Sequence, residues 1–287
     1  MMVNDTVSFF LSLSAGFLLN FWVWKKHFYS LSSFSWCNLP GTFLVAVFSF
    51  YLFIAYFGAP LIFRMVLELF PPSRNLATAA ELFVLFIMLA VLLLFTLHPR
   101  RKSITLKLLK YSDKDFSTLS TSLMHDIKMG LLTFIISYPV VAVVEQIGAW
   151  SIFRIFGIED YEQMAVTYFR QSLGSLFSLL SALFTIVLYA PCLEEFLFRG
   201  CLQTYLKNRW GFAVALPLSS LIFAFFHFSA SLGWGNLPIL LSLFVLASFL
   251  GFIYEKQKSL YASITLHASF NLLGVLQILY MHGSNGA

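Results

Sequence analysis

The sequence predicts an all-α fold, a polytopic transmembrane helical bundle of about eight spans. Of its 287 residues, 59% are hydrophobic and only 11% are Asp, Glu, Lys or Arg, whereas soluble domains are about 25% charged. The mean hydropathy is +0.83, and a soluble protein of this size needs a largely charged surface. The apolar residues also gather in runs of about 18 or more, the length that carries a helix across a ~30 Å hydrocarbon core. These observations predict a multi-pass integral membrane protein that has the lipid bilayer as its partner; in a prokaryote it would reside in the inner (plasma) membrane.

Eight apolar segments are long enough to be considered as spans. The predicted spans lie at about 7–24, 41–63, 79–97, 129–150, 172–192, 212–228, 237–254 and 259–280, with a shorter apolar helix at about 194–206. The first segment has no basic residue before it and no small-residue cleavage site after it. We therefore expect a membrane anchor there rather than a signal peptide.

Basic residues predict the orientation, because short cytoplasmic loops carry an excess of Lys and Arg. Most of the 18 basic residues fall between alternate spans, which predicts an outside N-terminus. The net charge of +5 is too scattered to indicate nucleic acid binding. The long basic segment at about 98–128 is expected in the cytoplasm, either on the anionic leaflet or as a solvated linker. We divide the chain into N-terminal membrane helices with this loop (1–128) and a segment (129–287) that holds every polar motif between residues 191 and 271.

The first polar cluster inside an apolar segment is the phrase PCLEEFLFRG at residues 191–200. Pro191 predicts that a helix is interrupted or restarted there, because proline lacks a backbone donor and suits the first helical turn. Glu195 and Arg199 are four residues apart on one face and are expected to pair, whereas Glu194 points about 100° away. One carboxylate is then neutralised, and Glu194 stays available as a general base.

Two further polar pairs stand in later apolar segments, Phe223 with His227 and His267 with Asn271. His267 and Asn271 share one helical face and are expected to donate hydrogen bonds to a common point. At 1.5 Å per residue, these groups and Glu194 fall at depths that allow one shared pocket. A carboxylate base, an imidazole that orients water and a His/Asn pair facing an oxyanion are the parts that water attack on an amide needs.

At these positions the chain resembles the CPBP family, the CAAX protease and bacteriocin-processing family of intramembrane endopeptidases. The family motifs are EExxxR, FxxxH and HxxxN, and they stand here in the family's order at 194–199, 223–227 and 267–271. The resemblance covers about residues 170–281. It implies a CAAX prenyl endopeptidase-like core within 129–287.

The resemblance also implies an activity and a set of site residues. The activity is that of a glutamate-type intramembrane endopeptidase, a hydrolase that cuts a peptide bond in a membrane-embedded or lipidated peptide substrate. Glu194 and His227 would activate water, and His267 and Asn271 would form the oxyanion hole. The supporting residues would be Glu195, Arg199 and Phe223.

Three alternatives remain open at this point. Two His and two Glu could hold zinc, but HExxH is absent and an Asn suits hydrogen bonding better than ligation, so we expect no cofactor. A non-catalytic immunity or scaffold protein could share the fold, because fold does not fix activity. A transporter also places polar groups near the midplane, although no inverted repeat is visible here.

Overall fold

The computed structural model describes residues 2–31, 39–69, 73–96, 102–109, 119–159 and 161–285. These residues form helices and no strand, which confirms the predicted all-α fold. The N-terminal elements are α1 (Met2–Lys25), α2 (Gly41–Phe53), η1 (Ile54–Gly58), α3 (Ala59–Leu69), α4 (Arg74–Thr96), α5 (Lys102–Leu109) and α6 (Leu119–Phe156). The later elements are α7 (Met164–Ser172), α8 (Leu176–Phe184), η3 (Thr185–Tyr189), α9 (Ala190–Glu195), η4 (Phe196–Gln203), α10 (Thr204–Trp210), α11 (Phe212–Phe225), η5 (Ala230–Gly235), α12 (Asn236–Gln257) and α13 (Leu260–Asn285).

Six helical stretches of the described chain are long and apolar enough to cross a membrane. They are Thr6–Lys25, Gly41–Met65, Leu123–Phe156, Leu176–Trp210, Ala230–Gln257 and Leu260–His282. The other two predicted spans correspond to shorter apolar helices at Asn75–Ala90 and Phe212–Phe225. The multi-pass membrane protein is therefore confirmed, whereas the number of eight spans is not.

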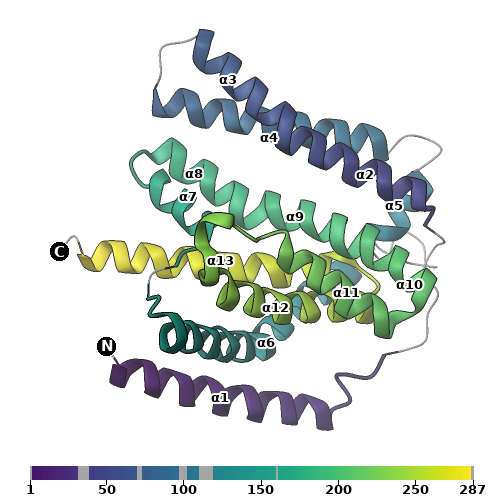
Figure 1. Cartoon of the computed structure of the whole chain (residues 1–287). Coiled ribbons are helices and arrows are strands. Elements are labelled where there is room, and N and C mark those ends of the chain that lie inside the picture. The colour runs from purple at the N-terminus through teal and green to yellow at the C-terminus, as the bar shows by residue number, and fades with distance from the viewer. Residues whose placement is uncertain are drawn as a thin grey trace.

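The later helices form a central body with N-terminal helices on either side of it. Figure 1 shows α6 and α8–α13 in the middle, α1 along one flank and α2–α4 along the opposite flank. The largest buried cluster joins these parts, because Phe43 and Val47 of α2 and Leu92 of α4 pack with Phe196 and Phe198 of η4. The largest buried cluster therefore contains residues from both sides of the predicted division at residue 128.

The segment predicted as a basic loop contains a helix that packs on the body. Leu108 of α5 is fully buried in the largest cluster, and Thr105 Oγ1 donates a hydrogen bond to the carbonyl of Thr96 at 2.8 Å. Lys107 on the same helix is exposed. α6 already begins at Leu119, within the predicted loop. Residues 97–101 and 110–118 lie outside the described residues.

Pro191 lies in the first turn of α9, where the helix changes from π-helical to α-helical without a break. The chain is helical from Leu176 to Trp210, and proline is accommodated because the π-helical segment η3 immediately precedes α9. In a π-helix each N–H donates to the carbonyl five residues earlier, as Ala190 does to Thr185. If this hydrogen-bond pattern continued, the backbone N–H of residue 191 would donate to the carbonyl of Ile186, but proline has no N–H. Pro191 therefore leaves the Ile186 carbonyl free within the helix.

A ladder of polar contacts fixes η4 and α10 against α12. Three side chains spaced four residues apart each bond a residue 48 positions later: Arg199 to the Ala247 carbonyl at 3.2 Å, Gln203 to the Gly251 carbonyl at 2.9 Å, and Lys207 to Glu255. The constant separation means that the two helices run parallel and in register. Gly251 permits this approach, because a Cβ there would meet the Gln203 side chain and, at 2.6 Å, Leu216 Cδ1.

Candidate active site

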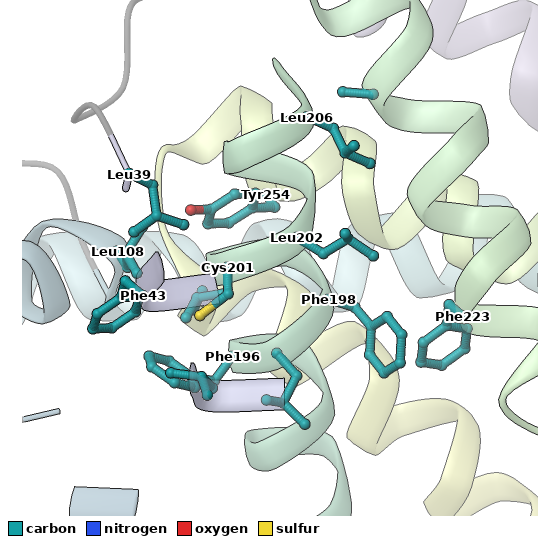
Figure 2. Close-up of a cluster of buried hydrophobic side chains, with 14 of the residues drawn as sticks. Leu39, Phe43, Leu108, Phe196, Phe198, Cys201, Leu202, Leu206, Phe223 and Tyr254 are labelled. Carbon is teal, nitrogen blue, oxygen red and sulfur yellow. The ribbon is translucent and has the colours of Figure 1, made fainter. Parts of the chain in front are cut away.

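The three motifs meet in the central body, although 77 positions separate the first motif residue from the last. Glu194 and Glu195 come from α9, His227 follows α11, and His267 and Asn271 project from α13. Figure 2 shows Phe198 of η4 facing Phe223 of α11, where the first and second motifs touch.

Glu195 is the hub of a buried charge cluster. Its Oε1 accepts one hydrogen bond from Arg199 Nη1 at 3.0 Å and another from His267 Nδ1 at 2.9 Å. The side chains of Glu195 and Arg199 are 0% and 2% exposed. The expected Glu195–Arg199 pair is therefore present. A buried carboxylate needs such partners, because an unpaired charge in the interior costs several kcal/mol.

Glu194 faces the two imidazoles. Its Oε2 lies 3.9 Å from Nε2 of His227 and 3.9 Å from Nε2 of His267. These distances exceed a direct hydrogen bond, and within the described residues Glu194 Oε2 is buried without a hydrogen-bond partner. The side chain as a whole is 23% exposed. Glu194 is thus the more accessible carboxylate of the pair, and its Oε2 is equally distant from the two imidazole nitrogens.

The hydrogen bonds of the two imidazoles fix which nitrogen faces Glu194. His227 Nδ1 lies 3.0 Å from the Phe223 carbonyl, and a carbonyl can only accept, so Nδ1 carries a proton. His267 Nδ1 likewise donates to the carboxylate of Glu195. Both rings therefore turn Nε2 toward Glu194, and in the neutral tautomer that nitrogen can accept a proton.

Phe223 is the apolar centre around which the charged groups are arranged. Its ring is fully buried, with the guanidinium carbon of Arg199 4.3 Å from the ring centroid. The ring centroids of His227 and His267 lie 4.9 and 5.8 Å from that of Phe223, and that of Phe198 lies 5.1 Å away. One aromatic ring therefore contacts both imidazoles and the guanidinium of Arg199.

His227 lies where a helix ends inside the membrane. α11 has 14 residues, or about 21 Å of helix, which is shorter than a ~30 Å hydrocarbon core. Non-helical backbone at that depth must be satisfied by protein. Asn236 does this for the turn after His227: its Oδ1 accepts from the Ser229 N–H at 2.9 Å, and its Nδ2 donates to the carbonyls of Ser229 at 2.7 Å and Gly233 at 2.9 Å.

Asn271 makes a different contact from the one that the sequence predicts. Its Nδ2 donates to the Ile186 carbonyl at 2.8 Å, the carbonyl that Pro191 leaves free. His267 instead directs its ring nitrogens to Glu195 and toward Glu194. The shared point expected for His267 and Asn271 is therefore not formed by direct contacts, although the Asn271 amide has a second hydrogen to donate.

The Ile186 carbonyl and Asn236 are the contacts that sequence reasoning missed. Asn236 stands next to no motif and gave no signal. Ile186 could have been found, because it lies five residues before Pro191 and would be freed by a π-turn.

Among the described side chains, no group of three or more His, Cys, Asp or Glu is arranged to hold a metal ion.

The fold and the site together define a polytopic α-helical membrane protein with a buried carboxylate–imidazole cluster. Residues 176–273 match the family model described as type II CAAX prenyl endopeptidase Rce1-like. This segment, which contains all three motifs, is similar to the Rce1-like family, and the resemblance read from the motifs is confirmed. The match indicates an enzyme of the protease kind. No curated protein matches the chain, and no solved structure matches it.

Proposed function

We propose that this protein is an intramembrane endopeptidase that hydrolyses a peptide bond of a membrane-anchored or lipidated substrate through water activated by Glu194 and His227. The observation that carries the proposal is the position of Glu194 Oε2, buried and 3.9 Å from the Nε2 atoms of His227 and His267. That separation suits a bridging water molecule better than a direct bond. A carboxylate and an imidazole beside one water are the parts of a general base.

The reaction can be written with these side chains alone. Glu194 takes a proton from water while the water oxygen bonds to the substrate carbonyl carbon, and His227 Nε2 orients that water. The carbonyl oxygen becomes an oxyanion, which the second Asn271 hydrogen and a protonated His267 Nε2 would stabilise. Glu195 would stabilise that imidazolium through its bond to His267 Nδ1, 2.9 Å long. Glu194 then returns the proton to the amide nitrogen, and the C–N bond breaks.

The environment of the site supports a substrate that reaches it from the bilayer. The reacting groups belong to helices that cross the membrane or end within it, so the scissile bond must be carried to that depth. The name of the matched family model, a prenyl endopeptidase, makes a peptide with a prenylated C-terminal CAAX sequence the first substrate to test. A peptide anchored by a transmembrane helix is the second.

The decisive experiment compares wild-type protein with Glu194→Gln in detergent or nanodiscs. Released peptides are measured by mass spectrometry. Loss of a general base typically costs 10²–10⁴-fold in rate, so we expect at least a hundredfold loss. The matched control is Glu68→Gln, which changes an exposed carboxylate on α3 and should cleave at the wild-type rate. Equal rates for wild type and Glu194→Gln would refute the assignment, and wild-type protein that cuts neither substrate would favour a non-catalytic role.

Metal removal is a second, independent test of the proposed mechanism. We propose that water is activated without a metal, so dialysis against EDTA or 1,10-phenanthroline should leave the rate within about twofold of the untreated protein. The control is a zinc protease treated in parallel. Complete loss that added Zn²⁺ restores would replace this mechanism by a metal-assisted one.

A further inference from the structure

Two adjoining cavities lie on the flank of the molecule, between the N-terminal helices and the central body. The larger has a volume of about 530 Å³ and is lined by η1, α3, α4, α7 and η3. The smaller, of about 350 Å³, is lined by α4, α7 and α8. Glu81 and Tyr168 line both cavities, so the two share a wall. Each volume falls within the ~300–1,000 Å³ range of small-molecule sites.

The two cavities differ in chemistry. Apolar side chains make most of the wall of the larger one, among them Ala55, Ala59, Phe63, Val84, Leu85 and Met88. Polar side chains make most of the wall of the smaller one, where Thr78 Oγ1 and Ser178 Oγ lie 2.9 Å apart beside Gln171 and Ser172. An apolar chamber that adjoins a polar one matches a molecule with an apolar tail and a polar head.

The shared wall carries a carboxylate without a cation. Tyr168 donates a hydrogen bond from its hydroxyl to Glu81 Oε2 at 3.1 Å. Burial, followed by the charge of Glu81, raises the pKa of Tyr168 to about 12, so the phenol keeps its proton and remains a donor at neutral pH. No Lys, Arg or His pairs with Glu81 among the side chains that the structure describes. A carboxylate beside an apolar chamber is stabilised by a cationic partner.

We propose that these two cavities form one binding site for a single-chain amphiphile with an ammonium head group. The apolar tail occupies the chamber lined by Ala59 and Met88, and the ammonium group lies in the polar chamber against Glu81. The site contains no residue of the three motifs, so it is independent of the proposed hydrolysis. It nevertheless adjoins the hydrolytic site, because Thr185 of its wall is next to Ile186, whose carbonyl Asn271 binds.

The test is photo-labelling of the whole protein in nanodiscs with three C16 probes that carry a diazirine in the chain: an amine, an alcohol and a carboxylic acid. We expect saturable labelling of peptides from α3, α4 and α7, strongest for the amine and at least tenfold weaker for the acid, which Glu81 repels. Unlabelled hexadecylamine should compete with the probe. Labelling that does not saturate, or that is equal for amine and acid, would mean ordinary lipid contact and would overturn the proposal.

Two substitutions separate the parts of the site. Ala59→Trp fills the apolar chamber and should lower labelling by all three probes, whereas Ala79→Trp, at an exposed position of α4 outside both cavities, should not. Glu81→Gln keeps the shape and removes the charge, so labelling by the amine should fall to the level of the alcohol. Thermal unfolding of each variant shows that the fold is kept. If Ala59→Trp labels as strongly as Ala79→Trp, or if Glu81→Gln keeps its preference for the amine, the site is wrong.

Discussion

The chain contains two Arg–Glu pairs with the same four-residue spacing in two very different regions. On α3, Arg64 Nε lies 2.9 Å from Glu68 Oε1, and the side chains are 80% and 64% exposed. In the central body, Arg199 Nη1 lies 3.0 Å from Glu195 Oε1, and the side chains are 2% and 0% exposed. Spacing and distance are nearly identical. What distinguishes the buried pair is its surroundings, since the same carboxylate also holds His267.

The two pairs should also differ in energy. An exposed pair contributes about 0–1 kcal/mol, because water and salt screen it. A buried pair gains little over apolar replacements, but removing one partner strands a charge and costs about 3–5 kcal/mol. The Arg199 guanidinium adds a bond to the Ala247 carbonyl at 3.2 Å and a contact with the Phe223 ring. The buried pair therefore connects several groups of the site, whereas the exposed pair is only a surface contact.

The largest effect is expected from breaking the buried pair. Arg199→Met should lower the free energy of unfolding by about 3–5 kcal/mol, because the buried Glu195 carboxyl group loses its guanidinium partner. Chemical unfolding in detergent measures the loss. A drop below 1 kcal/mol would show that the two pairs are equivalent after all.

A double variant separates stability from the role of the site. Glu195→Leu combined with Arg199→Met replaces both charges by apolar groups, so most of the lost stability should return. Peptide cleavage should not return, because His267 Nδ1 loses the acceptor that orients its ring. Recovery of cleavage together with stability would mean that the pair has only a structural role in helix packing.

The second effect concerns Asn271, which holds the backbone rather than a charge. Asn271→Ala should lower the free energy of unfolding by about 1–3 kcal/mol, because the Ile186 carbonyl loses its donor. Adding Pro191→Ala supplies a backbone N–H five residues after Ile186, which should recover stability. The rate of peptide cleavage then distinguishes two roles. It stays low in the double variant if Asn271 stabilises the oxyanion, and it recovers if Asn271 only satisfies the helix.

The sequence predicted the charged parts of the site better than its backbone. Glu195 and Arg199 were expected to pair, because a four-residue spacing brings two side chains together on any helix. The position of Asn271 could not be obtained in this way. It depends on a π-turn around Pro191, where a tertiary contact replaces the missing backbone donor. A sequence pattern reports which side chains share a face, but not which carbonyls are left without a partner.

The fold was also only partly predictable from the sequence. Apolar length predicted the helices, but not that α11 would end after 14 residues at His227. That ending depends on Asn236, whose three hydrogen bonds satisfy the turn and which lies outside every motif. The packing of α5 against η4 was not predicted either, because the basic residues around Leu108 indicated a segment on the anionic leaflet or a solvated linker.

The smallest loss of stability is expected at the exposed pair, and it is the reference for the losses at the buried positions. Arg64→Met should change the free energy of unfolding by less than about 1 kcal/mol, because Glu68 stays in contact with solvent when its partner is lost. The pair's contribution should also fall as salt is raised from 0.05 to about 0.5 M, where the Debye length shrinks well below 10 Å. The buried pair should show no such dependence, because no solvent ions reach it. Arg64→Met and Arg199→Met should not lower the free energy of unfolding equally if burial distinguishes the Glu195 cluster. An equal loss under the same conditions would contradict that explanation and would weaken the argument for an active site at Glu194.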